Sequence, residues 1–293
     1  MTVVVRRPGP PLDGLVRAIT YQAGEQQQTS VEKILPGAGT GLWVNLNQDE
    51  FRSFGDSGQV TSVPGAMLAG PNGHATVIEF EAGRAHVSVT LALGAAACFA
   101  GAPLAVARDE LVPLAELWGH PGACLRERLL EAGTPQDTLR VMEDVLLGRL
   151  ANVADPGPDP AVTAAARALS AGIPVGEVAD GLGLLPRTLR RRFTAGVGLS
   201  PKRFARVRRL QRLVRDLDGQ SRVDWAAAAA RHGYADQPHL ADDFRDLAGV
   251  TPGEYLRSRI NGPTHLSVPA EQLQGQAAGT GVRAAASSAR KRS

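Results

Sequence analysis

Residues 232–255 read HGYADQPHLADDFRDLAGVTPGEY, and this stretch has the spacing of a tight turn followed by a short amphipathic helix. Leu240 and Phe244 lie four residues apart, so a helix would place both side chains on one buried face. Gly233 can adopt the left-handed backbone that a tight turn between two helices needs. Thr251-Pro252 has the pattern of an N-cap followed by the first residue of the next helix. The stretch therefore predicts a helix-turn-helix unit.

The same pattern occurs once more, about fifty residues earlier. L-x3-F-x4-G-x-[ST]-P-x2-[FY] begins at Leu189 and again at Leu240, and an Ala-x3-Gly pair precedes each copy. Self-similarity at a nearly constant offset indicates a duplicated structural unit. The residues expected to hold the two units together are Ala179, Gly183, Leu189, Phe193, Ala229, Gly233, Leu240, Phe244 and Pro252.

A long basic helix is expected between the two units. Ser200-Pro201 predicts its start, and the helix would run to about Leu217. Residues 185–215 hold eleven basic side chains and no acidic one. A stretch that repels itself this strongly usually faces a polyanion, although a plain helical bundle is the alternative. The basic residues are Arg187, Arg190, Arg191, Arg192, Lys202, Arg203, Arg206, Arg208, Arg209, Arg212 and Arg215.

These motifs resemble the DNA-binding domain of the AraC/XylS family of bacterial transcription regulators. The resemblance rests on GEVADGLGLLPRTLRRRF (176–193), on the joining helix and above all on the 232–255 motif, and it covers roughly residues 161–260. It implies base contacts from Arg187, Arg190 and Arg191 in the first unit, where arginine pairs well with guanine. In the second unit it implies base contacts from Gln237, His239 and Asp242. Phosphate contacts are expected from Arg192, Lys202 and Arg203.

The second unit departs from the family pattern in its charge. Asp242 stands where the family often has a basic residue, and residues 223–250 carry two basic and five acidic groups. Carboxylates facing phosphates are repelled, although Asp can accept a hydrogen bond from cytosine. We therefore expect the first unit and the joining helix to supply most of the affinity for DNA.

The first half of the chain predicts a different kind of structure. Short apolar runs rich in β-branched residues alternate with Gly, Pro, Asn and Asp, which is typical of strands and turns. From about Asp109 the apolar period becomes helical. A last apolar stripe over residues 139–150 is either intrachain core or a dimer seam. The expected strands include Val3–Val5, Leu42–Leu46, Ala75–Phe80 and His86–Leu93.

The predicted fold class is α+β, with a β-rich N-terminal domain and trailing helices, followed by an all-α domain of two helix-turn-helix units joined by a long helix. The net charge is −7 over residues 1–160, +7 over 161–260 and +3 over 261–293. Three prolines and a glycine among residues 155–160 predict a linker. The expected divisions are 1–154 for effector binding or dimerisation, 155–160 for the linker, 161–260 for DNA binding, and 261–293 for a disordered tail.

The expected partners are double-stranded DNA, a small-molecule effector, a second copy of the chain and RNA polymerase, with no membrane contact. The sequence has no G-x-S-x-G or Walker motif and no metal-ligand spacing, so we expect no enzyme activity, no cofactor and no metal. No long apolar run follows MTVVVRRPGP, which favours a cytoplasmic protein. Two alternatives stay open: an effector-independent dimeric DNA-binding protein, and an enzyme or carrier domain fused to a DNA-binding module.

Overall fold

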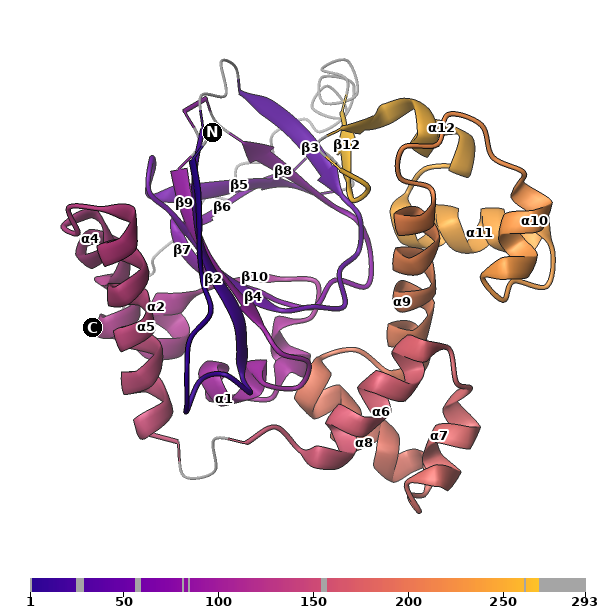
Figure 1. Ribbon diagram of the computed structural model, residues 1–293, viewed down its shortest axis with the longest axis horizontal. Coiled ribbons are helices and arrows are strands. Elements are labelled where there is room, and N and C mark those ends of the chain that lie inside the picture. Colours follow the sequence, from indigo (N-terminus) through magenta and orange to yellow (C-terminus); the bar gives the residue numbers. More distant parts are fainter. Residues whose placement is uncertain are drawn as a thin grey trace, which may run out of the picture.

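The computed structural model places a β-rich N-terminal half beside a helical C-terminal half (Figure 1). The structure describes residues 2–24, 29–55, 59–80, 82–83, 85–153, 157–260 and 262–268. The predicted α+β fold class is confirmed. None of the helices in these ranges combines the length and the hydropathy needed to span a bilayer.

Two antiparallel sheets form the N-terminal half. The first sheet has the order β1 (Thr2–Arg6), β2 (Val16–Ala23), β9 (Ala85–Leu91), β4 (Gly41–Asn45), β7 (Ala66–Ala69) and β10 (Leu111–Pro113). The second has the order β11 (Arg259–Ile260), β12 (His265–Ser267), β3 (Ser30–Ile34), β8 (Thr76–Phe80), β5 (Glu50–Phe54) and β6 (Val60–Pro64).

Alternating side chains build the core of the first sheet. Leu42 and Val44 of β4 lie opposite Val89 and Val87 of β9, and all four side chains are buried. Alternation places every second residue on one face, so these β-branched and leucine side chains meet across neighbouring strands.

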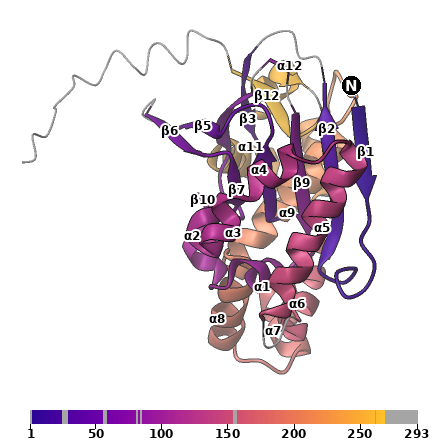
Figure 2. The same ribbon diagram turned by 90° about the vertical axis from the view of Figure 1, so that its left-hand side faces the viewer.

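Short helices and one long helix cover this half of the molecule (Figure 2). They are α1 (Ala96–Ala100), the 3-10 helix η1 (Leu104–Ala107), α2 (Leu114–Trp118), α3 (His120–Ala123), α4 (Leu125–Leu130) and α5 (Pro135–Ala151). Thr134 caps α5, since its side chain accepts a hydrogen bond from the Asp137 amide. The helical period predicted from Asp109 begins too early, because Leu111 lies in β10, where it pairs with Ala69 of β7.

The apolar stripe of α5 belongs to the intrachain core. Leu139, Met142, Leu146 and Leu150 are buried, and α5 packs on β2. This stripe is therefore not available as a dimer seam, and homodimerisation keeps only the resemblance as its support.

The C-terminal half is all helical up to residue 258. It consists of α6 (Pro160–Ala171), α7 (Val175–Gly181), α8 (Pro186–Val197), α9 (Pro201–Asp216), α10 (Trp225–Arg231), α11 (Gln237–Ala248) and α12 (Pro252–Ser258). The N-caps expected at Ser200 and Thr251 are confirmed, and Asp236 caps α11 in the same manner; each side chain accepts a backbone hydrogen bond. Of the expected linker, residues 155 and 156 lie outside the described residues.

The chain then returns to the N-terminal half. Strand β12 pairs antiparallel with β3, and Leu266 is buried in the same apolar cluster as the helical domain. The expected tail over residues 261–293 is therefore wrong for residues 265–267, because the edge of β3 supplies backbone partners that local composition does not reveal. The rest of that prediction, from residue 269 onward, lies outside the described residues.

Candidate nucleic-acid interface

The two helix-turn-helix units have the same turn geometry. Gly183 and Gly233 have φ angles of 62° and 74°, in the left-handed region that favours glycine. In each turn an amide bonds back to the alanine carbonyl, from Leu184 to Ala179 at 3.0 Å and from Tyr234 to Ala229 at 2.9 Å. The repeat in the sequence thus corresponds to a repeat in space.

The apolar residues of the motif lie inside the units. Ala179, Leu189, Phe193, Ala229, Leu240, Phe244 and Pro252 are all buried. Phe193 of α8 packs edge-on against Phe204 of α9, with ring centroids 5.1 Å apart. Phe244 of α11 packs on Tyr255 of α12 with the two rings tilted, at a centroid distance of 5.4 Å. Each second helix is therefore held by an aromatic contact to the helix that follows it.

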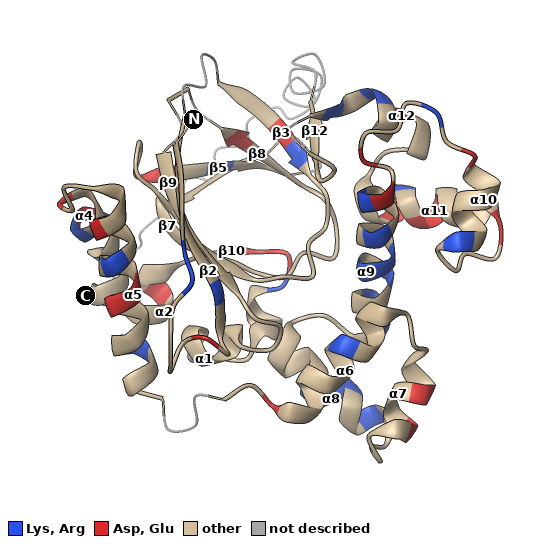
Figure 3. Cartoon of the chain, in the orientation of Figure 1, with Lys and Arg blue, Asp and Glu red and all other residues tan. Residues whose placement is uncertain are grey.

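The N-terminal part of α8 presents three exposed arginines. Arg187, Arg190 and Arg191 are solvent-exposed, and no ion pair with another described residue involves their guanidinium groups. Figure 3 shows basic residues in blue along α8 and α9. An exposed, unpaired arginine on a recognition helix can donate two hydrogen bonds to guanine O6 and N7. The geometry is thus compatible with the base contacts expected from the sequence.

The corresponding side chains of α11 are exposed and polar. Gln237 carries no basic charge, and the Asp242 carboxylate lies 3.3 Å from the Arg245 guanidinium. The Nδ1 atom of His239 accepts a hydrogen bond from the Ala235 amide at 3.2 Å. This bond leaves the proton on Nε2, so His239 presents a donor to whatever α11 faces.

The three residues expected to contact phosphate differ in their surroundings. Lys202 is exposed at the start of α9. Arg192 instead forms a two-point pair with Asp159, the N-cap of α6, with both distances at 2.7 Å. Hydrogen bonding from Arg192 lowers the pKa of Asp159. Arg203 also has protein partners, the Gly73 carbonyl and the Asp246 carboxylate. Lys202 is exposed as a phosphate contact would be, whereas the guanidinium groups of Arg192 and Arg203 are bonded to other parts of the protein.

The positive charge of the joining helix α9 is partly neutralised in the folded structure. Arg206 and Arg209 both reach Asp243 of α11, at 2.6 and 3.0 Å, and the Asp243 side chain is only 3% exposed. On another side of the helix, Arg208 and Arg212 bond to Ser170 of α6. Acids distant in sequence therefore neutralise part of the acid-free stretch. The expectation that α9 supplies much of the DNA affinity is accordingly weakened.

A groove of about 930 Å³ runs along α9 between the two units. Lys202 and Arg212 of α9 line it, together with Arg231, His239 and Asp242 of the second unit. The groove joins a side chain expected to contact phosphate to two expected to contact bases.

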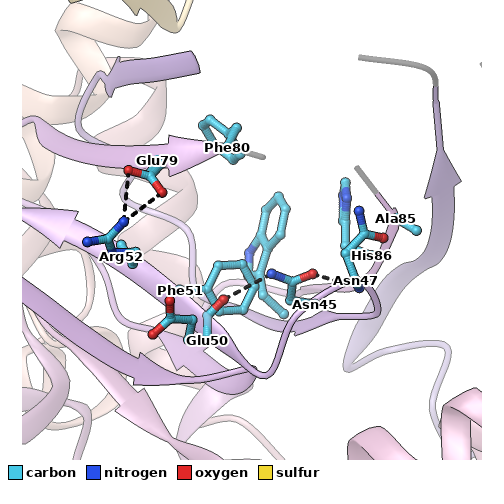
Figure 4. Close-up of a pocket in the computed structure, with 10 residues that line it drawn as sticks. Asn45, Asn47, Glu50, Phe51, Arg52, Glu79, Phe80, Ala85 and His86 are labelled. Atoms are coloured by element: carbon cyan, nitrogen blue, oxygen red, sulfur yellow. Dashed lines mark hydrogen bonds and ion pairs between the residues drawn. The ribbon is translucent and has the colours of Figure 1, made fainter. Parts of the chain in front are cut away.

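The N-terminal half contains a small polar pocket between its sheets (Figure 4). Trp43 stacks on His86 with ring centroids 5.0 Å apart, and Arg52 pairs with Glu79 at 3.1 Å. The enclosed volume is about 30 Å³, which fits a water molecule rather than an organic effector. Binding of an effector here would require the sheets to separate.

Two features of the structure have no counterpart in the sequence prediction. His120 lies one helical turn before Cys124, with both ring nitrogens 3.6 Å from the sulfur. The loop between β7 and β8 contacts the helical domain. Spacing could have revealed the His120–Cys124 pair, but no pattern marks the loop. Among the described residues, no group of three His, Cys, Asp or Glu side chains is placed to hold a metal ion.

Comparison with known protein families identifies the helical domain. A family model described as a helix-turn-helix domain matches residues 164–258. No curated protein matches the chain. Similar solved structures include ToxT from Vibrio cholerae O395, with 9% identity, a TM-score of 0.43, and coverage of 81% of this chain and 97% of that chain. Unsaturated fatty acid bound ToxT from strain SCE256 has 10% identity, a TM-score of 0.43, and coverage of 80% and 94%. The AraC-like transcriptional activator CuxR has 16% identity, a TM-score of 0.25, and coverage of 72% and 86%. Residues 164–258 of this chain are a helix-turn-helix domain of the type found in AraC-family DNA-binding transcription regulators.

Proposed function

We propose that the protein is a sequence-specific transcription regulator that reads two neighbouring half-sites on double-stranded DNA. The observation that carries the proposal is the pair of matched helix-turn-helix units, each with a buried apolar face and exposed polar residues near the start of its second helix. The exposed side chains of Arg187, Arg190 and Arg191 on α8 support stronger binding by the first unit. The Asp242 side chain, 79% exposed, supports weaker binding or cytosine preference by the second.

Selection of bound sequences from random double-stranded DNA, using the full chain, tests this proposal. We expect two half-sites about one helical turn apart, roughly 10 base pairs from centre to centre. Absence of any enriched sequence at low ionic strength, also in the presence of cell extract that could supply an effector, would contradict the proposal.

The contrast between Arg190 and Lys202 gives a sharper prediction. Arg190→Ala should cost about 1–3 kcal/mol on the selected DNA and relax the base preference at one position. Lys202→Ala should weaken binding equally on all sequences and lower the slope of log affinity against log salt by about 1. Fluorescence anisotropy titrations over a range of salt concentrations measure both effects. If both variants lost the same affinity on every DNA sequence, α8 would contact only the DNA backbone and not the bases.

Control by a small molecule at the N-terminal domain is the second part of the proposal. The AraC-type helix-turn-helix domain supports it as an implication of its family, whereas the pocket around Trp43 and Arg52, at about 30 Å³, would have to open to admit an effector. A thermal-shift screen of the full chain tests it: an effector should raise the melting temperature and change the affinity for the selected DNA. A full chain that binds DNA as a dimer and responds to no compound would favour the effector-independent alternative. Turnover of a compound would favour the fused-enzyme alternative.

A cytoplasmic, homodimeric regulator that contacts RNA polymerase completes the proposal. The AraC-type domain supports this part as an implication of its family, and size-exclusion chromatography with light scattering tests the dimer. A monomer at micromolar concentration in the presence of the selected DNA would contradict it.

A further inference from the structure

A ladder of charges joins α9 to the second recognition helix. Arg203, Arg206 and Arg209 are three residues apart, so they form one stripe along α9. Asp243 and Asp246 have the same spacing on α11 and lie between these arginines. Each aspartate thus has two arginine neighbours, and the ladder fixes α11 against α9.

Arg203 extends this ladder to the N-terminal domain. Its Nη1 atom donates to Asp246 at 2.7 Å, while Nε and Nη2 donate to the Gly73 carbonyl at 3.1 and 2.7 Å. The side chain is 19% exposed. The guanidinium group of Arg203 in α9 therefore bonds both to the loop between β7 and β8 and to α11.

The Gly73 end of this contact is itself fixed. The Gly73 amide donates to the Asp109 carboxylate at 2.6 Å, and the Ala75 amide donates to the Leu247 carbonyl of α11 at 2.9 Å. The loop of residues 71–75 therefore touches α11 directly, as well as through Arg203.

A phosphate role for Arg203 is disfavoured by this arrangement. Three of the five N–H donors of the guanidinium group already bond to the Asp246 carboxylate and the Gly73 carbonyl, so a phosphate would have to compete with both partners. Hydrogen bonding from Arg203 lowers the pKa of Asp246, as expected for a carboxylate that stays ionised beside a cation. Without the arginines, the neighbouring carboxylates of Asp243 and Asp246 would add repulsion to a unit that is already acidic.

We propose that Arg203 is a positioning residue, which sets the orientation of α11 relative to α8 and makes binding of the second half-site depend on the N-terminal loop 71–75. This inference rests on the proposed function as a DNA-binding regulator. It assigns Arg203 to the geometry of the second unit rather than to a phosphate.

The test compares two DNA duplexes of the selected sequence, one intact and one with the second half-site scrambled. For the full-length wild type, the intact duplex should bind more tightly. In Arg203→Ala this preference should fall about tenfold, the loss expected for one hydrogen-bonded charge. Its affinity for the scrambled duplex and its salt slope should stay at the wild-type values. The matched control, Lys202→Ala, should weaken both duplexes equally and lower the salt slope by about 1.

Asp246→Asn provides a second, milder variant. It keeps the contact between Arg203 and Gly73, and the Asp246 side chain is 49% exposed, so the fold should be retained. A smaller loss of preference for the second half-site is expected. Circular dichroism checks that each variant is folded. Should Arg203→Ala not fold, the outcome with Asp246→Asn decides, and an unchanged preference would overturn the inference.

Three outcomes are distinguishable. Equal weakening of both duplexes by Arg203→Ala, with a lower salt slope, would make Arg203 a phosphate contact and overturn the inference. A wild type that binds both duplexes equally would also overturn it, while leaving DNA binding intact. A wild type that binds no DNA would contradict the proposed function. In that case amide hydrogen exchange in α11 tests the positioning role of Arg203 without DNA. Exchange should be faster in Arg203→Ala than in Lys202→Ala, and equal rates would overturn the inference.

Discussion

Arginine has three different environments in the helical domain, although the sequence presents it as one basic stretch. Arg190 is exposed, Arg206 is paired with buried Asp243, and Arg208 donates to Ser170. Burial is the main cause that lowers the pKa of Arg208, with Arg215 and Arg212 adding repulsion. The charge count predicted a cationic domain correctly. It could not separate the three environments, because the neutralising acids lie in α11, more than thirty residues away.

His232 should make the stability of the second unit depend on pH. Its side chain is 6% exposed, and burial lowers its pKa below 6.5, while Asp216 at 3.2 Å opposes the shift and Arg212 and Arg231 add to it. Below about pH 6.5 the unfolded chain takes up a proton that the folded chain does not, so stability falls as the pH decreases. The melting temperature of the wild type should therefore drop more between about pH 7.5 and 5.5 than that of His232→Gln. Parallel pH profiles would show that His232 is not responsible.

Asp159 should stabilise the start of the helical domain. Its carboxylate accepts from the Ala161 and Val162 amides and pairs with Arg192. Asp159→Ala should lower the free energy of unfolding by about 1–2 kcal/mol, the usual cost of losing an N-cap. The exposed Asp180 provides the control, since Asp180→Ala should change stability by less than about 0.5 kcal/mol. Urea denaturation measures both, and equal effects would contradict the capping role.

Helices with local signals were predictable from sequence, and elements that depend on distant partners were not. Ser200, Asp236 and Thr251 mark the helix starts through side chains that cap within three residues. Strands β10 and β12 have no comparable local signal. They form because β7 and β3 offer backbone partners that are far away in the sequence.

The contact between α8 and the N-terminal domain gives a prediction at the scale of elements. Gly198 ends α8 with φ at 83°, and a Cβ there would lie 2.5 Å from Pro71 Cγ and 2.9 Å from the Leu104 carbonyl oxygen. Gly183 has a similar φ of 62°, but a Cβ there would meet nothing within 4 Å. Both alanine variants pay a backbone strain of about 1–2 kcal/mol. Gly198→Ala should be destabilised further and should expose the loop of residues 71–75 to hydrogen exchange. Equal melting temperatures for the two variants would show that this contact is not tight.

At the scale of the molecule, the two halves pack against each other and are not merely joined by a linker. Leu35 and Ala38 of the N-terminal half are buried in the apolar cluster of the helical domain. The exposed faces of the candidate site could be inferred from the repeat, because helical spacing separates buried from exposed positions. The packing of the two halves could not be inferred from the sequence, because Gly73 and Ala75 bond to the helical domain through backbone atoms that every residue type possesses.

The return of the chain to β3 has a practical consequence for dividing the protein. Cutting at the linker would leave an N-terminal piece in which β3 has lost the neighbour on one side, with its amides and carbonyls open to solvent. Glu32, which is fully buried, would lose the His265 ring that lies 2.6 Å from its carboxylate. Such a fragment would tend to pair with copies of itself through the exposed edge of β3. Its oligomeric state would therefore say little about that of the intact protein.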